Sequence, residues 1–474
     1  MPKTKILCTL GPATGSRERI GELLDAGMSA ARLNFSHGDH ATHAERIANL
    51  RAASAERDKM TPIVADLQGP KVRTGKLEGG GPVELRAGGR LRLTPRTLLG
   101  DSEIVSLDYD SLAQDVESGD KILLADGALH LLVERLDGED VVCEVLNDGE
   151  LGERKGVNVP GADMKVPSIT AKDKDDLRFA LEQGVDYVAQ SFVRRAKDVQ
   201  LARNLIEWAG KSTHIIAKIE KPQALEDLEA ILDAADGVMV ARGDLGVELN
   251  PWQVPLAQKK IIEAAARWRK PVITATQMLE SMIEHPSPTR AEASDVANAV
   301  FDGSDCLMLS AETAAGKYPI ETVRMMSKII EAAESSITAP NLELGKAPRA
   351  EEEFSIEVAH SAARLAEKLS AKYIVIYTET GYSAKLVSKH HPTCRIAAFS
   401  RHEDVCHRLK LLWGVRSKHI REVEDLDALV SLVDSMMRNL HWADVGDLIV
   451  VVCGTPLTVG GRTDLVKLHR IGQA

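Results

Sequence analysis

The stretch that decides the fold is HIIAKIEKPQALEDLEAILDAADGVMVARGDLG, residues 214–246. It contains two apolar runs, 215–217 and 237–241, that are typical of buried parallel strands, and a helical pattern separates them. Lys218 and Glu220 close the first run two residues apart. Side chains alternate along a strand, so this spacing puts both on one face. A cation and a carboxylate are therefore predicted side by side at the strand end.

The second run is followed by Arg242-Gly243-Asp244-Leu245-Gly246, whose glycines let backbone amides approach a ligand closely. Asp244 follows the second strand much as Glu220 ends the first. Parallel strands joined by a helix bring equivalent ends together, which places the two carboxylates to share a Mg²⁺ with substrate oxygens. A surface ion pair and a simple helix cap remain the alternative from spacing alone.

The same pattern repeats outward along the chain. Strands followed by helical patterns are expected at 3–9, 30–34, 61–66, 185–189, 215–218, 237–241, 271–275 and 305–309. Eight such units close a (β/α)₈ (TIM) barrel, whose active site lies at the carboxyl ends of the strands. Polar residues gather at these ends: Arg32, Asn34, Asp66, Ser191, Lys218, Glu220, Asp244, Thr276, Ser310 and Glu312.

With 474 residues, the chain is too long for one core. Residues 70–167 show short alternating runs split by Gly/Asp turns, which predicts an all-β insert. Residues 335–353 resemble a linker. The expected protein is of the α/β class: a barrel from 1–69 and 168–340, the insert, and a C-terminal α/β domain over 354–474.

Composition and charge argue against some binding partners and indicate a cellular compartment. A net charge of -11 argues against general nucleic-acid binding. The six cysteines are dispersed without a CxxC pair, so a reduced, cytoplasmic compartment is expected. No apolar run approaches the length of a membrane span, and no signal peptide is visible at the N-terminus.

Two motifs suggest binding sites that their residue spacing does not support. His37, His40 and His43 recur every three residues, a spacing that scatters them around a helix, so a zinc site is not expected and His40 and His43 are predicted to be solvated. Residues 210–212 end like a P-loop, but Leu205 stands where the upstream glycine is required.

A loop in the C-terminal domain is also polar. Its hydroxyls, with the N-terminus of the following helix, suit a phosphate, although capping of that helix by the same hydroxyls is an equal alternative. The loop residues are Thr378, Thr380, Gly381 and Ser383.

Taken together, the motifs resemble those of the pyruvate kinase family, in order and over essentially the whole chain. The resemblance implies a barrel, a lid insert and a regulatory C-terminal domain. The matching segments are ARLNFSHG (31–38), DLQGPKVR (66–73), KGVNVPG (155–161), IIAKIEKPQAL (215–225), MVARGDLGVE (239–248), TATQMLESM (274–282), PTRAEASDVANAV (288–300) and LSAETAAGKYP (309–319).

The implied reaction is phosphoryl transfer from phosphoenolpyruvate to ADP, giving pyruvate and ATP in the last step of glycolysis. Its anionic transition state needs positioning and positive charge. By resemblance, Glu220 and Asp244 hold Mg²⁺, with Mn²⁺ possible. Lys218 stabilises the moving phosphoryl group and the enolate, and Arg32 grips the phosphate with Arg73 nearby.

The resemblance assigns the remaining substrate contacts. Backbone amides around Gly243 and Asp244 bind the carboxylate, and Ser191 lies with the substrate residues. Thr276 is expected to relay a proton through water, because a threonine hydroxyl is too weak an acid to act alone.

On the nucleotide side, the resemblance points to Asn34, His37, Arg73 and Lys155. Asp126 of the insert is expected to help when the lid closes and excludes water.

Many family members need K⁺, and here that site departs from the family pattern. Asn34, Ser36 and Asp66 are present, but Leu67 replaces a threonine and Lys71 replaces a glutamate. An ammonium group supplies the charge the ion would give, so activity is expected to be independent of K⁺.

The regulatory loop departs from the family as well. Glu379 puts a carboxylate into the expected phosphate cradle, which predicts little response to fructose 1,6-bisphosphate and favours a sugar monophosphate or AMP as effector. The resemblance also implies a homotetramer. A lyase or mutase built on the same barrel chemistry, and a ligand-sensing relic without activity, are the competing functions.

Overall fold

Eight parallel strands close into a barrel in the order β1-β16-β15-β14-β13-β12-β3-β2. The computed structural model describes the chain except residues 1, 163, 338–343, 345–351, 458–459 and 474. The predicted (β/α)₈ barrel is confirmed. Its strands are β1 (Lys5–Thr9), β2 (Ala30–Asn34), β3 (Ile63–Asp66), β12 (Tyr187–Val193), β13 (His214–Ile219), β14 (Gly237–Ala241), β15 (Val272–Ala275) and β16 (Cys306–Leu309).

Helices surround these strands and begin where the sequence supplies caps. Ser16 accepts a hydrogen bond from the Arg19 amide at the start of α1, and Gly27 ends that helix at φ 128°. The larger barrel helices are α1 (Arg17–Ala26), α2 (His40–Glu56), α4 (Ala171–Glu182), α5 (Ala196–Trp208), α9 (Val254–Arg267), α10 (Arg290–Phe301) and α12 (Pro319–Ser336), and α11 (Ala311–Ala314) is a single turn.

Two details of the deciding stretch differ from expectation. The helical segment between β13 and β14 is divided at Asp227 into α6 (Pro222–Glu226) and α7 (Leu228–Ala234). The glycine-containing segment after β14 forms a short helix, α8 (Arg242–Glu248), rather than an open loop.

The prediction that His40 and His43 are solvated is wrong for His43. Its ring is buried and stacks on Phe35 with centroids 4.4 Å apart. His40 is more exposed, but its Nε2 lies 2.8 Å from Asp176 and its ring stacks on Phe179. Aromatic neighbours from outside the histidine triplet decide both positions.

The insert is a separate β domain, called the lid here. It has a six-stranded sheet, β11-β7-β8-β9-β5-β6, and a two-stranded sheet, β10-β4. Its elements are β4 (Val83–Leu85), β5 (Arg90–Thr94), β6 (Ile104–Ser106), α3 (Leu112–Asp115), β7 (Lys121–Leu124), β8 (Leu129–Asp137), β9 (Asp140–Val145), β10 (Gly149–Leu151) and β11 (Val157–Asn158).

The C-terminal domain is a five-stranded sheet, β19-β18-β17-β20-β21, in which only the β20–β21 pair is antiparallel. Residues 338–343 and 345–351 of the predicted linker lie outside the described residues. The elements are α13 (Glu353–Lys368), β17 (Tyr373–Tyr377), α14 (Tyr382–Lys389), β18 (Arg395–Ser400), α15 (Glu403–Leu409), β19 (Val415–His419), α16 (Leu426–Asn439), β20 (Leu448–Cys453) and β21 (Leu465–Arg470).

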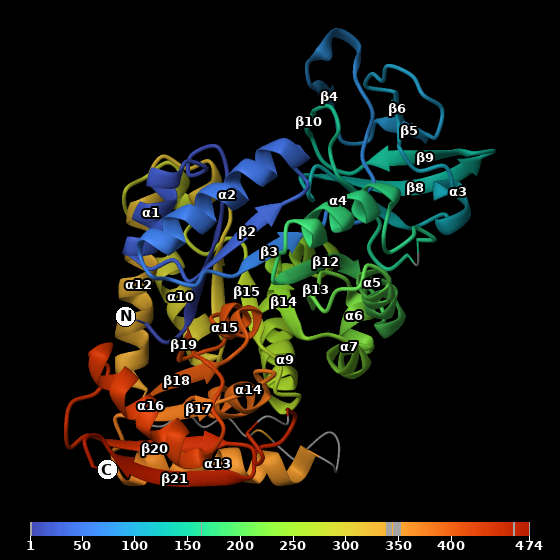
Figure 1. The fold of residues 1–474 in the computed structure, drawn as a ribbon. Helices are drawn as coiled ribbons and strands as arrows, with labels where there is room; N and C mark the ends of the chain where they lie inside the picture. Colours follow the sequence, from blue (N-terminus) through green and yellow to red (C-terminus); the bar gives the residue numbers. More distant parts are fainter. Residues whose placement is uncertain (1, 163, 338–343, 345–351, 458–459, 474) are drawn as a thin grey trace.

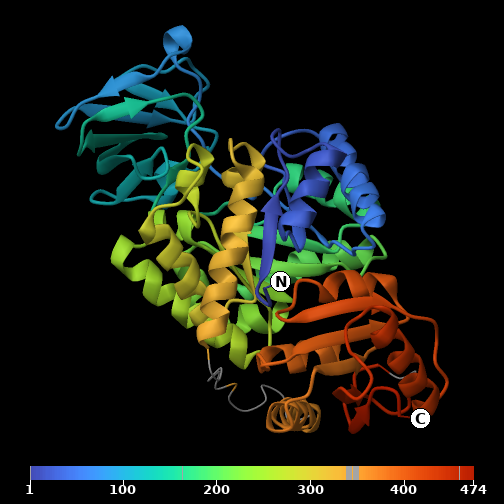
Figure 2. The same ribbon diagram turned by 90° about the vertical axis from the view of Figure 1, so that its left-hand side faces the viewer.

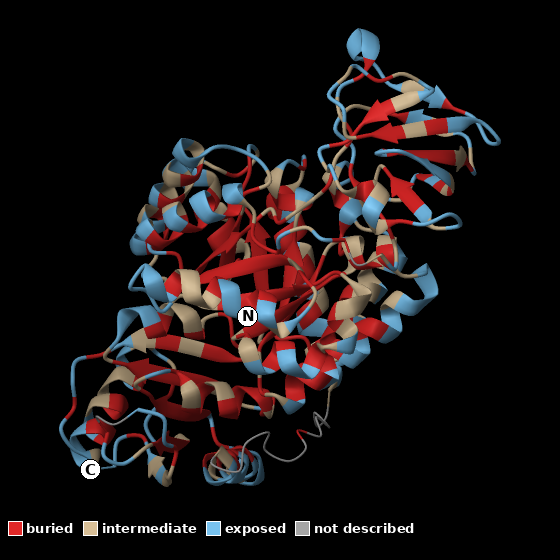
Figure 3. Ribbon diagram, turned by 90° about the vertical axis from the view of Figure 1, so that its right-hand side faces the viewer, coloured by how far each residue is buried: buried red, intermediate tan, exposed pale blue. Residues whose placement is uncertain are grey.

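The lid and the C-terminal domain lie at opposite ends of the barrel (Figures 1 and 2). Each has a hydrophobic cluster of its own, and the barrel strands form the most continuously buried part of the molecule (Figure 3). Because the lid continues from the carboxyl end of β3, the barrel mouth opens toward the lid.

In the described part of the chain, we find no helix with both the length and the apolarity needed to cross a membrane.

Candidate active site

Lys218, near the end of β13, is the charged centre of the barrel mouth. Its Nζ lies 2.9 Å from Oε1 of Glu220 and 3.1 Å from Oδ1 of Asp66, and it donates a 2.7 Å hydrogen bond to Ser191 Oγ. Burial alone would lower the pKa of this ammonium group, but the two carboxylates outweigh burial and raise the pKa. Lys218 is therefore a fixed cation at neutral pH.

Asp66, the last residue of β3, joins Lys218 to the neighbouring Arg32. Arg32 Nε donates to Asp66 Oδ2 at 2.6 Å, and Arg32 Nη1 donates to Thr9 Oγ1 at 3.0 Å. Burial tends to raise the pKa of Asp66, yet Lys218 and Arg32 together hold this pKa below its usual value. An ionised Asp66 thus orients two cations, one on β2 and one on β13.

Glu220 and Asp244 follow neighbouring parallel strands, in which Lys218 pairs with Met239. Glu220 Oε2 accepts a 2.7 Å hydrogen bond from the Phe192 amide. Phe192 has φ 56° and lies where the β12 register shifts, a bulge that directs its amide toward Glu220. Burial, and the nearby charge of Asp244, raise the pKa of Glu220.

The two carboxylates fit a hard divalent cation because they repel each other electrostatically without one. Within the described residues, no group of three or more His, Cys, Asp or Glu side chains is arranged to hold a metal. Mg²⁺ is typically bound in this way, by one or two carboxylates together with oxygens of a substrate and water.

Thr276 sits on a strained turn after β15, with φ 70° at Thr276 and 55° at Gln277. Its Oγ1 donates to the Ala275 carbonyl at 2.6 Å and accepts a 2.8 Å hydrogen bond from the Gly243 amide. The predicted substrate residues Thr276 and Gly243 are therefore in direct contact.

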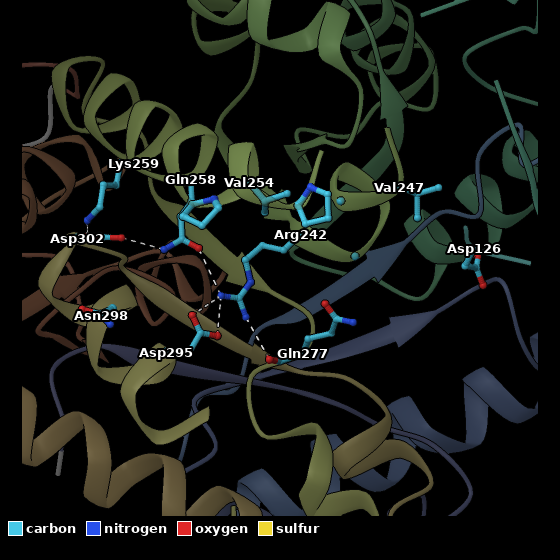
Figure 4. Close-up of a pocket in the computed structure, with 14 residues that line it drawn as sticks. Asp126, Arg242, Val247, Val254, Gln258, Lys259, Gln277, Asp295, Asn298 and Asp302 are labelled. Atoms are coloured by element: carbon cyan, nitrogen blue, oxygen red, sulfur yellow. Dashed lines mark hydrogen bonds and ion pairs between the residues drawn. The ribbon is translucent and has the colours of Figure 1, made fainter. Parts of the chain in front are cut away.

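Arg242 holds this turn from the other side, in the pocket of Figure 4. Its Nη2 donates to the Thr276 carbonyl at 2.7 Å, and its Nη1 lies 2.7 Å from Asp295. The pocket has a volume of about 730 Å³, and Asp126 of the lid also lines it. Lys218 and Glu220 are not among its lining residues.

Lys71 connects the lid to the mouth. Its Nζ lies 3.1 Å from Asp126 Oδ1 and 3.8 Å from Asp244 Oδ1. At the four residues predicted as the K⁺ position, Asp66 binds two cations, and the Asn34 side chain accepts from the Ser36 amide at 3.1 Å. Leu67 has no side-chain oxygen, and its backbone carbonyl accepts a 2.7 Å hydrogen bond from Ser191 Oγ.

The predicted nucleotide residues lie in two groups. Asn34 ends β2 and His37 lies in the turn that follows, where the His37 amide donates to the Asn34 carbonyl at 3.2 Å. Arg73 and Lys155 belong to adjacent backbone segments at the base of the lid, with Arg73 bridged to Gly156. The barrel thus supplies one group and the lid the other.

Two hydroxyls of the C-terminal loop, those of Thr378 and Ser383, form hydrogen bonds within the C-terminal domain. Thr378 Oγ1 accepts from the Gly381 amide at 3.0 Å, and Ser383 Oγ lies 2.7 Å from Thr463 Oγ1. Glu379 accepts hydrogen bonds from Tyr377, Arg401 and His402. These bonds hold the pKa of Glu379 below its usual value despite burial, and they balance its charge.

The fold and the mouth define a lid-covered (β/α)₈ enzyme that sets fixed cations beside paired carboxylates. Two family profiles match the chain: "Pyruvate kinase, barrel domain" over residues 1–323 and "Pyruvate kinase, alpha/beta domain" over residues 357–469. The chain therefore belongs to the pyruvate kinase family and is a phosphotransferase.

Similar proteins agree with this placement. Pyruvate kinase 2 of Synechocystis is 45% identical over 98% of this chain and 79% of its own length. A Mycobacterium tuberculosis pyruvate kinase is 43% identical over 99% and 98%. The crystal structure of a Cryptosporidium parvum pyruvate kinase superposes with a TM-score of 0.93 at 40% identity, covering 99% of this chain and 96% of that one.

Some residues that organise the mouth were not predicted. Arg242 and Glu248 both lie within the matched segment MVARGDLGVE, but only its glycine and aspartate were given roles. Phe192 acts through its backbone amide, which no side-chain pattern reveals. Arg242 and Glu248 could have been identified from their place in a segment that matches the family.

Proposed function

We propose that the chain transfers the phosphoryl group of phosphoenolpyruvate to ADP, giving pyruvate and ATP. The observation that carries this proposal is the Lys218 ammonium, held 2.9 Å from Glu220 and 3.1 Å from Asp66 at the barrel mouth. A preorganised cation stabilises charge that develops in a loose, anionic transition state.

Each polar group at the mouth has a role in this reaction. Arg32, oriented by Asp66 and Thr9, binds the phosphoryl oxygens with Arg73, and Ser191 fixes the Lys218 ammonium. Lys218 neutralises the phosphoryl group in transfer and the enolate that remains. The Thr276 hydroxyl relays a proton, through water, to the enolate carbon.

Glu220 and Asp244 would hold Mg²⁺ or Mn²⁺, which supplies Lewis-acid stabilisation of the substrate oxygens when bound. Backbone amides at Gly243 and Asp244 bind the substrate carboxylate, which takes the place of Thr276 Oγ1 as the acceptor for the Gly243 amide. Asn34, His37, Arg73 and Lys155 bind the nucleotide from the barrel and lid sides, so lid closure completes the ADP site and excludes water.

The reaction is proposed to be independent of K⁺. The Lys71 ammonium stands 3.8 Å from Asp244, which places a permanent positive charge beside the substrate site. Two observations support this proposal: Asp66 already binds Arg32 and Lys218, and the Asn34 side chain accepts a hydrogen bond from the Ser36 amide.

Regulation, assembly and location are proposed as well. The loop of Thr378, Thr380, Gly381 and Ser383 binds a sugar monophosphate or AMP, in a homotetramer in the cytoplasm, where the enzyme acts in glycolysis. Two of these residues, Thr380 and Gly381, line a cavity of about 210 Å³ between the barrel and the C-terminal domain. Exposed Trp252, Leu256 and Phe301 provide apolar surface for subunit contacts.

A coupled assay for ATP tests the reaction. Purified protein is supplied with phosphoenolpyruvate, ADP and Mg²⁺, and ATP and pyruvate are measured separately. Equal amounts of both, dependent on ADP, are expected. Pyruvate or an isomer formed without ADP would indicate a lyase or mutase instead, and no turnover with any divalent cation would indicate a ligand-sensing relic.

A further inference from the structure

A buried carboxylate at the far end of α8 joins three parts of the molecule. Glu248, the last residue of α8, has a side chain only 2% exposed. Its Oε1 lies 2.5 Å from Lys221 Nζ and accepts a 2.8 Å hydrogen bond from Asn158 Nδ2. Lys221 belongs to the barrel and Asn158 to lid strand β11, so one oxygen atom connects both domains.

Lys221 and helix α8, which carries Glu248, are each connected to one of the proposed metal-binding carboxylates. Lys221 directly follows Glu220, and α8 carries Asp244 in its first turn. The Lys221–Glu248 ion pair therefore links the segment of one carboxylate to the helix of the other. Lys221 also lies over the Phe192 ring, 5.5 Å from its centroid, and the Phe192 amide binds Glu220.

The lid approaches α8 at both of its ends. Asn158 pairs with Leu123 of β7, and the turn after β7 carries Asp126, which contacts Lys71 near Asp244. The same lid sheet thus meets α8 near Asp244 through Lys71 and at Glu248 through Asn158. A rigid movement of the lid would change both contacts together.

The junction itself holds only a small cavity. A cavity of about 30 Å³ lies between the lid and the barrel, and Asn158, Phe192 and Lys221 are among its lining residues. The Asn158–Glu248 hydrogen bond is a specific polar contact across this junction.

We propose that Glu248 is a positioning residue that couples the lid to the divalent-cation site. When the lid is closed, Asn158 and Lys221 hold Glu248, which fixes α8 relative to the end of β13 and so sets the spacing of Glu220 and Asp244. Outer partners of metal ligands change metal affinity by about 10- to 100-fold. By linkage, a bound cation favours the closed lid to the same extent.

This proposal rests on the proposed function only in taking Glu220 and Asp244 as a cation site. The test is a titration with Mn²⁺ alone, following free Mn²⁺ by electron paramagnetic resonance, with no phosphoenolpyruvate or ADP present. Failure of the coupling is thereby distinguishable from failure of the reaction, which the ATP assay reports.

Asn158→Ala removes the lid contact and leaves the Lys221–Glu248 pair in place. It is expected to weaken Mn²⁺ binding about 3- to 10-fold, below the full range for outer partners because one contact remains. Lys221→Met should weaken it similarly, and the double variant should lose less than the product of the two, because both act through Glu248.

Gln223→Ala is the matched control. Gln223 also donates a hydrogen bond across the junction, to the Ala162 carbonyl at 3.4 Å, but it does not contact Glu248, so wild-type Mn²⁺ affinity is expected. Wild-type affinity in a folded Asn158→Ala protein would overturn the proposal. If that protein does not fold, the isosteric Asn158→Asp, which sets a second carboxylate against Glu248, must weaken Mn²⁺ binding or the proposal is overturned.

Discussion

The barrel mouth and the C-terminal loop both place polar side chains directly after parallel strands, yet their hydrogen bonds differ. At the mouth, the Lys218 ammonium is held between two carboxylates, that of Glu220 two residues away and that of Asp66 on β3. In the loop, the uncharged hydroxyl of Thr378 binds the amide of Gly381, three residues away. Ionised groups that hold one another fix a charge at the mouth, whereas the Thr378 hydroxyl stabilises the turn that precedes α14.

Among the changes proposed for the two regions, Lys218→Met is expected to lower kcat the most. Losing a preorganised cation costs about 10²- to 10³-fold in kcat, and it leaves Asp66 and Glu220 as buried carboxylates with less compensation. The coupled ATP assay measures the rate, and circular dichroism monitors folding. A folded variant with kcat near that of the wild type would show that the mouth does not work as described.

A smaller effect is expected from Lys71→Glu, which should make the rate depend on K⁺. The wild type should show the same rate in K⁺, Na⁺ and tetramethylammonium salts, because Lys71 carries the charge in all three. The variant should be about 10-fold faster in K⁺ than in tetramethylammonium, as expected when one nearby charge contributes about 1.4 kcal/mol.

Lys71→Gln is the matched control for that prediction, because it removes the charge without adding a carboxylate. Its rate should be low in every salt. A wild-type enzyme that loses most of its rate without K⁺ would contradict the role of Lys71.

The pH dependence of stability probes the barrel's opposite end, where His214 lines the same cavity as Thr380 and Gly381. Burial, opposed in part by Asp236, lowers the pKa of His214 to about 4, against about 6.5 in an unfolded chain. The unfolded state therefore binds the proton more tightly, and stability is lost as pH falls from about 6.5 toward 4.

His214→Gln should make the melting temperature less sensitive to pH over that range. Thermal unfolding at pH 7 and at pH 4.5 measures the difference, with kcat at pH 7 unchanged. An equal loss of melting temperature in both proteins would mean that His214 is not responsible.

The smallest expected effect is that of Thr378→Val, which removes the acceptor for the Gly381 amide. A lost hydrogen bond of this kind costs about 1 kcal/mol of stability, and basal kcat should not change because the loop lies far from Lys218. Thr380→Val, whose contact with the Tyr382 amide is longer at 3.4 Å, should cost less. A large fall in basal kcat for Thr378→Val would contradict the contrast between the two regions.

Much of the barrel could be predicted because it depends on local pattern. Apolar runs, glycine stops and helix caps such as Ser16 mark each unit, and eight units imply closure. The break at Asp227 and the helix at 242–248 could not be predicted, because a few residues with mixed propensity are decided by packing. His43 was misjudged for the same reason, since Phe35 provides its stacking partner.

The sequence by itself determined which residue types end each strand and hence that cations and carboxylates face one mouth. Side-chain alternation within a strand and the succession of strands along the chain can both be followed in the sequence. Only the tertiary structure decided which of them meet. Asp66 binds both Arg32 and Lys218, and lid residue Asn158 contacts Glu248. These contacts join residues that are 34 to 152 positions apart in the chain. Such contacts depend on barrel closure and lid docking, which no local pattern specifies.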